Sequence, residues 1–78
     1  MNLRHRDVFE VVARAVSAAP EPYAGRLRDF AERDLANEPP ETQWPRAVLW
    51  LNGNFPPASA AGPAWARRVA RIVAGVGV

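Results

Sequence analysis

The sequence predicts a small all-α protein, a bundle of three to four short helices with proline-rich connections. Apolar residues recur at helical spacing in four separate segments. The chain contains no cysteine, so a small disulfide-stabilised fold is excluded. The eight prolines fall at or near the boundaries of these segments, where a residue without a backbone N–H does least harm. With 78 residues the chain has room for one domain, which we place at residues 1–78.

The first helix is expected over residues 3–19. Val8, Val12 and Val16 follow one another at four-residue intervals and so form one apolar stripe. Pro20 disfavours helical backbone at the residue before it and ends the segment.

The second helix is expected over residues 22–37. Pro22 can occupy its first turn without the loss of a hydrogen bond. Leu27, Phe30 and Leu35 then form the apolar stripe.

The third helix is expected over residues 43–52. Thr42 is suited to cap it, Pro45 to occupy its first turn, and Gly53 to follow its last residue. A strand over residues 47–51 is the alternative. The prolines that follow would make a poor return strand, because proline cannot donate to a ladder, and this favours the helix.

The fourth helix is expected over residues 63–75. Trp65, Val69 and Val73 form its apolar stripe, and Gly75 is a natural terminator.

The charge is unevenly distributed along the chain. The net charge is only +2, and the isoelectric point of about 10.4 reflects basic residues that are all arginine. Residues 21–44 carry three arginines against six acidic residues (−3), whereas residues 45–78 carry four arginines and no acidic residue (+4). A dedicated nucleic-acid-binding chain normally has a larger positive excess. Arginine without lysine, together with abundant alanine, indicates a GC-rich bacterial genome.

No group of residues points to catalysis. His5 is the only histidine, and the scattered carboxylates do not supply three or four metal ligands at a recognisable spacing. Arginines alternate with the acidic residues of the second segment, which is typical of a solvated, salt-bridged helix face. We therefore expect a protein that is not an enzyme and that has no catalytic residue, cofactor or metal.

Arg67, Arg68 and Arg71 are expected to lie together on one face of the last helix. The guanidinium fork suits carboxylates and phosphates alike, so this cluster can bind an acidic protein or a nucleic acid. The alternative is structural: the cations would stabilise the dipole at the end of the helix or pair with the acidic second helix.

Two further sets of residues are candidates for partner binding. Trp50 lies off the apolar stripe of its helix, near Phe55, and tryptophan is enriched in binding hot spots. Trp50 could instead cover the second side of a thin domain, and both interpretations stay open. Asp29 and Glu32 are the candidates for an acidic recognition surface.

The leading hypothesis is a non-enzymatic protein-binding module or inhibitor that docks onto a larger protein or protein complex. Stand-alone inhibitors of this size are carried by phages and mobile elements, and they include anti-defence (anti-CRISPR-like) proteins. A small nucleic-acid-binding regulator that uses the arginine cluster is the first alternative, and a structural homo-oligomer such as a homodimer is the second.

We expect a cytoplasmic protein with no membrane partner. Charged residues from Arg4 to Glu10 interrupt any apolar signal segment, and prolines interrupt the uncharged stretch 47–66.

Overall fold

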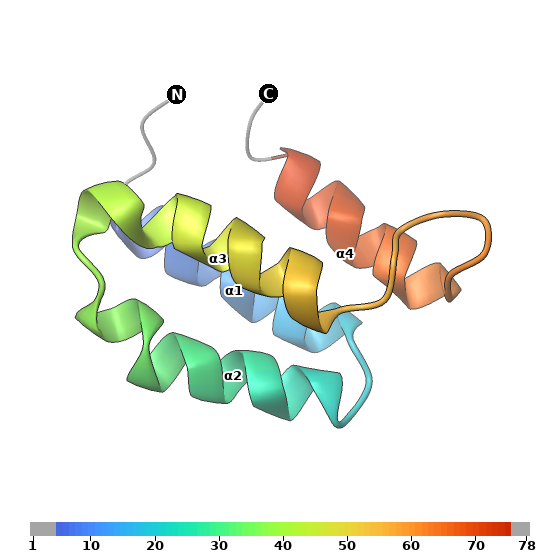
Figure 1. Ribbon diagram of the computed structural model, residues 1–78, viewed down its shortest axis with the longest axis horizontal. Coiled ribbons are helices and arrows are strands. Elements are labelled where there is room, and N and C mark those ends of the chain that lie inside the picture. The colour runs from blue at the N-terminus through green and yellow to red at the C-terminus, as the bar shows by residue number, and fades with distance from the viewer. Residues whose placement is uncertain (1–4, 76–78) are drawn as a thin grey trace.

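The computed structural model describes residues 5–75, with side chains from Val8 onward, and this part of the chain is helical with no strand (Figure 1). Its elements are α1 (His5–Ala18), α2 (Tyr23–Arg33), a short 3₁₀ turn η1 (Leu35–Asn37), α3 (Pro40–Asn54) and α4 (Ala64–Gly75). The all-α prediction is therefore confirmed, and residues 47–51 belong to a helix. Residues 3 and 4 of the predicted first helix, and the side chain of His5, lie outside the described part.

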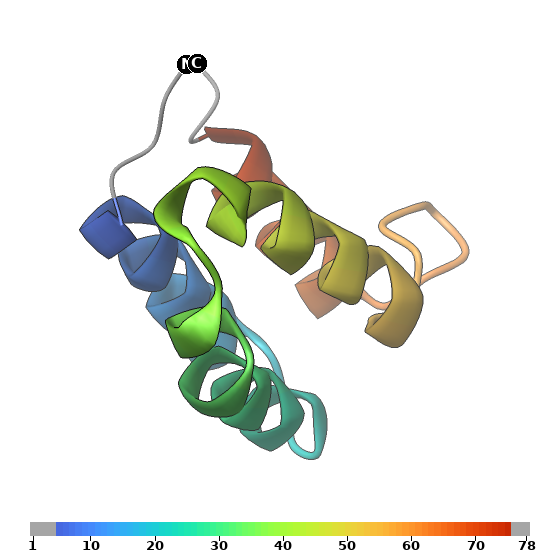
Figure 2. The same ribbon diagram turned by 60° about the vertical axis from the view of Figure 1, so that its left-hand side comes forward.

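Helix α1 is the central element of the fold. It packs against α2, α3 and α4, and α2 runs back along it after a short turn (Figure 2). Val8, Val11, Val12 and Ala15 are buried, whereas Val16 is only half-buried. The packed face is therefore centred closer to Val11 than the sequence stripe suggested.

A single core cluster draws side chains from every helix. Burial of these apolar groups is the main source of stability for such a small chain. The cluster consists of Val8, Val12, Ala15, Leu27, Phe30, Ala31, Leu35, Ala47 and Val69.

Helix α2 ends at Arg33, earlier than predicted, because the backbone tightens into η1 and carries Leu35 fully into the core. The side-chain nitrogen Nδ2 of Asn37 donates a hydrogen bond of 2.6 Å to the carbonyl oxygen of Arg33. This bond satisfies one of the carbonyls that the end of an α-helix leaves without a partner.

Helix α3 begins at Pro40, three residues before the predicted start. Two predictions are therefore wrong. Thr42 lies inside the first turn, where its hydroxyl is 3.1 Å from the carbonyl oxygen of Pro39, and it is not the cap. Pro45 lies inside the helix rather than in its first turn, and it cannot donate the hydrogen bond that the carbonyl oxygen of Glu41 would accept.

The far end of α3 also extends beyond the prediction. Gly53 is still helical and has a negative φ, so it is not the glycine that follows the helix. The helix ends at Asn54, whose side-chain nitrogen donates to the carbonyl oxygen of Trp50 at 2.8 Å.

A buried glutamine fixes the start of α3 against η1. Gln43 is only 1% exposed, and its Nε2 donates to the carbonyl oxygens of Glu38 at 3.0 Å and Leu35 at 3.4 Å. Both neighbours are acceptors, so the nitrogen of the amide must face them. The sequence pattern did not identify this residue, because a single glutamine is normally exposed.

Candidate interaction surface

An apolar groove, which we call the α3–α4 groove, lies between the second half of α3 and helix α4. These two helices each pack on α1 and make few direct contacts with each other, which leaves a space of about 250 Å³. The loop that follows α3 lines the groove as well, with residues 55–58.

Small side chains make up the wall of the groove that α4 contributes. They lie at positions i, i+3, i+4, i+7 and i+8, so they share one helix face and cover about 12 Å of its length. They are Ala66, Val69, Ala70, Val73 and Ala74.

The opposite wall is formed by larger apolar side chains that are only half-buried. Val48 and Leu51 come from α3, and Phe55 comes from the loop. These side chains keep part of their apolar surface in water, as the lining of a ligand or partner site does.

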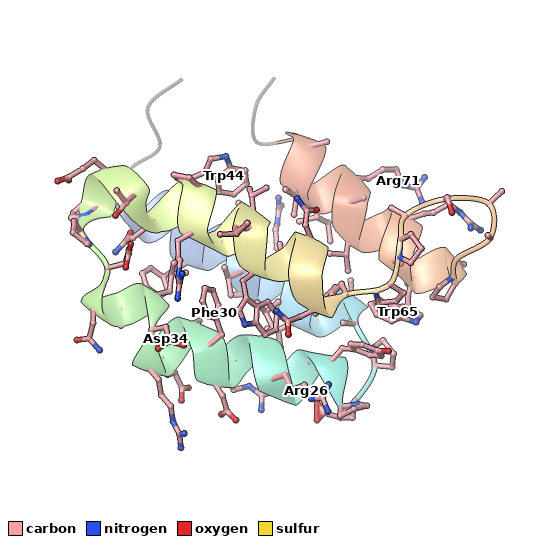
Figure 3. The ribbon with its side chains drawn as sticks, viewed as in Figure 1. Arg26, Phe30, Asp34, Trp44, Trp65 and Arg71 are labelled. Carbon is pink, nitrogen blue, oxygen red and sulfur yellow. The ribbon has the colours of Figure 1, made fainter. Side chains whose placement is uncertain are left out.

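Two arginines border the groove. Arg67 and Arg71 line a shallower hollow together with Ala70 and Ala74, and these two alanines also line the groove. We call this pair of arginines the arginine edge; Arg71 is labelled in Figure 3.

Arg68 does not belong to the arginine edge. It is exposed, it lines neither hollow, and at 3.6 residues per turn it lies roughly 60° around the helix from Arg71. All three arginines therefore lie within about 100° of the helix circumference, as predicted, but only Arg67 and Arg71 line the hollow beside the groove.

Arg67 also has a structural role. Its Nη1 donates to the carbonyl oxygens of Ser59 at 3.0 Å and Gly62 at 3.1 Å, which ties the loop between α3 and α4 to the start of α4. None of the predicted arginines lies in the last turn of α4, so the idea that they stabilise the dipole at its C-terminal end is wrong.

The aromatic residues form a connected cluster beside the groove. Phe55 meets Tyr23, Trp50 and Trp65 edge-on, with ring centroids 5.6, 5.9 and 5.5 Å away. Trp50 is half-buried and stacks on Phe30. Phe55 therefore contributes to the wall of the groove, whereas Trp50 covers the second side of the core.

The acidic candidates lie elsewhere. Asp29 and Glu32 are exposed on α2, and Glu32 lines a hollow between α1 and α2 that shares no residue with the α3–α4 groove. No salt bridge joins either carboxylate to another side chain in the described part of the molecule.

Helix α2 is also less acidic than its surrounding segment suggested. Its three arginines outnumber its two carboxylates, so Tyr23–Arg33 carries +1. The negative charge of residues 21–44 comes from Glu21, Asp34, Glu38 and Glu41, outside that helix. Three of these four lie around η1 and the start of α3, where Asp34 is labelled in Figure 3.

The structure thus places Phe55 in the wall of the groove, in contact with Trp50, and places Arg67 and Arg71 in the adjoining hollow. Arg68, Asp29 and Glu32 line neither of these two sites. Sequence reasoning did not identify the groove itself. The signal that could have indicated it is the row of alanines at positions 66, 70 and 74, four residues apart on one helix. It also missed Leu49, which is 66% exposed on the outer side of α3.

Two features are absent from residues 5–75. These residues contain no group of three or more histidine, cysteine or acidic side chains placed to hold a metal ion. They also contain no helix with the length and apolar character needed to cross a membrane. Comparison of the chain with protein-family models, with curated proteins and with solved structures finds no match.

Proposed function

We propose that the chain is a non-enzymatic protein-binding module that docks onto a larger protein or complex through the α3–α4 groove and its arginine edge. The observation that carries this proposal is the groove itself. Apart from Asn52 it is lined by apolar residues, it opens to the surface, and it is bordered by two arginines.

Burial of the groove would supply the binding free energy. Apolar surface removed from water contributes about 25 cal/mol per Å². The half-buried side chains of Val48, Leu51, Phe55 and Val73 offer such surface in one continuous site. An apolar centre with arginine at its border is the usual anatomy of a protein–protein interface.

The same geometry favours a protein over a nucleic acid. Arg67 already donates to its own loop, and Arg68 points away from the groove, so the cations do not form one continuous phosphate-binding stripe. Apolar side chains also contribute nothing to phosphate contacts, which supply most of the affinity of a nucleic-acid-binding protein.

Affinity capture from the native host with matched variants tests the proposal. Ala70→Glu places a carboxylate in the wall of the groove, and Ala64→Glu places the same group at an exposed position of the same helix. We expect Ala64→Glu to recover the same partner as the wild-type protein and Ala70→Glu to recover roughly tenfold less. Circular dichroism melts establish that both variants are folded.

Equal recovery by both variants would contradict a role for the groove. The sharper form of the proposal, an inhibitor carried by a phage or mobile element, is supported by the small size of the chain. Its test is whether addition of the purified protein blocks the activity of the captured complex.

A further inference from the structure

We propose that the occupant of the α3–α4 groove is an acidic amphipathic helix of the partner protein. This inference rests on the proposed function, because it names the chemistry of the partner for the same site.

The shape of the groove fits a helix. The α4 wall extends about 12 Å, which is the length of roughly two helical turns. Its alanines at positions 66, 70 and 74 leave room for a helix to approach closely. Leu51 and Phe55 form part of the opposite wall. A helix bound in a groove inserts side chains at i, i+3, i+4 and i+7, and this spacing matches the length available.

The charge around the groove selects an acidic occupant. Arg67 and Arg71 border the groove, and residues 45–75 contain no acidic residue. A carboxylate at this border therefore meets two cations and no anion of α4 or of the second half of α3. Arg71 makes no hydrogen bond or ion pair within the described part of the chain. Its guanidinium is therefore available for a bidentate bond with a carboxylate.

The spacing of the arginine edge also suits a helix. Arg67 and Arg71 are four residues apart, which places them on one side of α4 with about 6 Å between their Cβ atoms. Arg67 uses one nitrogen for the loop carbonyls and keeps further donors on its guanidinium. Two carboxylates one turn apart on a bound helix have the same spacing and can pair with both arginines.

A second copy of the chain fits the groove less well. Helix α2 carries +1, and the carboxylates of Asp34, Glu38 and Glu41 lie around η1 and the start of α3, at the opposite end of the molecule from Arg71 (Figure 3). Contact between these two ends would join copies head to tail or in an antiparallel pair. In either arrangement the copy would present a 3₁₀ turn and the start of a helix to the arginine edge, and not one amphipathic helix face.

A pair of charge-swapped peptides tests the proposal on the intact protein. The first is a fluorescein-labelled 16-residue amphipathic helix with leucine on one face and glutamate beside it, and the second has lysine in place of every glutamate. Fluorescence anisotropy gives their affinities. We expect the glutamate peptide to bind at least roughly tenfold more tightly than the lysine peptide, with a preference that weakens as salt is added.

Two variants of α4 provide the matched control. Both Arg71→Glu and Arg68→Glu reverse one exposed charge on the same helix, but only Arg71 borders the groove. We expect Arg71→Glu to weaken binding of the glutamate peptide by about fivefold or more and Arg68→Glu by less than about twofold. In a nitrogen–proton correlation spectrum, the peptide should shift the amide signals of Leu51, Ala70 and Ala74.

Several outcomes would overturn the inference. Equal binding of both peptides, equal effects of both variants, or tighter binding of a DNA duplex than of the glutamate peptide would each show that the groove does not select an acidic helix. A dimer in light scattering that the glutamate peptide dissociates would assign the groove to a second copy. If neither peptide binds while Ala70→Glu still prevents capture of the native partner, the proposed function stands and this inference is wrong.

Discussion

Trp50 of α3 stacks on Phe30 of α2, with ring centroids 4.9 Å apart and ring planes at 17° to each other. Helices α2 and α3 share few other direct contacts, since both are organised around α1 and η1. The stacked pair therefore holds the second half of α3 over the core. Phe55 and Tyr23 extend this connection to Trp65 on α4.

Replacement of Trp50 should therefore cost stability. We expect Trp50→Ala to lower the free energy of unfolding by about 2 kcal/mol, because it removes a half-buried aromatic side chain and its ring contacts. Leu49→Ala, at the neighbouring exposed position, should stay within about 0.5 kcal/mol of the wild type. Urea unfolding followed by circular dichroism at 222 nm measures both. If Trp50→Ala is as stable as the wild type, Trp50 has no structural role, and its interpretation as an exposed partner-binding residue is favoured.

The helical class and the approximate positions of all four helices could be predicted from the sequence, because the period of the apolar residues reports directly on secondary structure. The start of α3 could not. Pro40 and Pro45 are both compatible with a first helical turn, and local preference does not choose between them. The choice comes from a tertiary interaction, since Gln43 donates to the carbonyls of Leu35 and Glu38 from within the first turn of a helix that begins at Pro40.

Gln43→Glu should destabilise the protein in a pH-dependent way. The substitution keeps the shape but directs a buried carboxylate at two carbonyl oxygens, so we expect a loss of about 2–3 kcal/mol at pH 7. Burial and the facing oxygens should raise the pKa of the introduced carboxyl in the folded state above its ordinary value of about 4.3. The folded state then binds more protons than the unfolded state, so the loss should shrink as the pH falls from 7 towards 4.

Urea unfolding of the wild type and the variant across this pH range measures the difference. Gln43→Met is the control, because it removes the same hydrogen bonds without a charge. We expect the loss of unfolding free energy in Gln43→Met to be independent of pH. If the loss in Gln43→Glu is also independent of pH, the introduced carboxyl is not held against the two carbonyls.

Two glycines should respond to alanine with opposite signs. Gly53 is helical, and a Cβ added there would meet no atom within 4 Å. We expect Gly53→Ala to raise stability by about 0.5 kcal/mol, because alanine loses less conformational entropy in a helix. At Gly62 the carbonyl oxygen of Pro57 occupies the space that a Cβ needs, so Gly62→Ala should lower the melting temperature. A loss of stability in Gly53→Ala would indicate that the helix ends at residue 52, as the sequence predicts, and that Gly53 is not helical.

The groove could not be predicted because its residues resemble core residues in the sequence. Leu51, Val69 and Val73 lie on apolar stripes that a helical wheel assigns to the interior. Only Val69 is buried, because α3 and α4 each pack on α1 and make few direct contacts with each other. Which part of an apolar stripe stays uncovered depends on how three helices cross, and periodicity carries no information on that angle.

Arg67 and Arg68 are adjacent in the sequence but should behave differently when replaced. Arg67→Ala removes the hydrogen bonds to the carbonyls of Ser59 and Gly62, whereas the Arg68 side chain makes no such bond within the described residues. We expect Arg67→Ala to cost about 1 kcal/mol and Arg68→Ala to stay within about 0.5 kcal/mol of the wild type. The loop should also open more often in Arg67→Ala, since the Gly62 N–H donates to Ser59 within the same turn.

Amide hydrogen exchange at Gly62 measures this opening directly, and cleavage of the loop by elastase, which cuts after small residues, provides a second readout. Both should accelerate in Arg67→Ala and remain unchanged in Arg68→Ala. If the two variants exchange at the same rate, the loop is held by its own turn and its prolines, and Arg67 is as free as Arg71 to bind a partner.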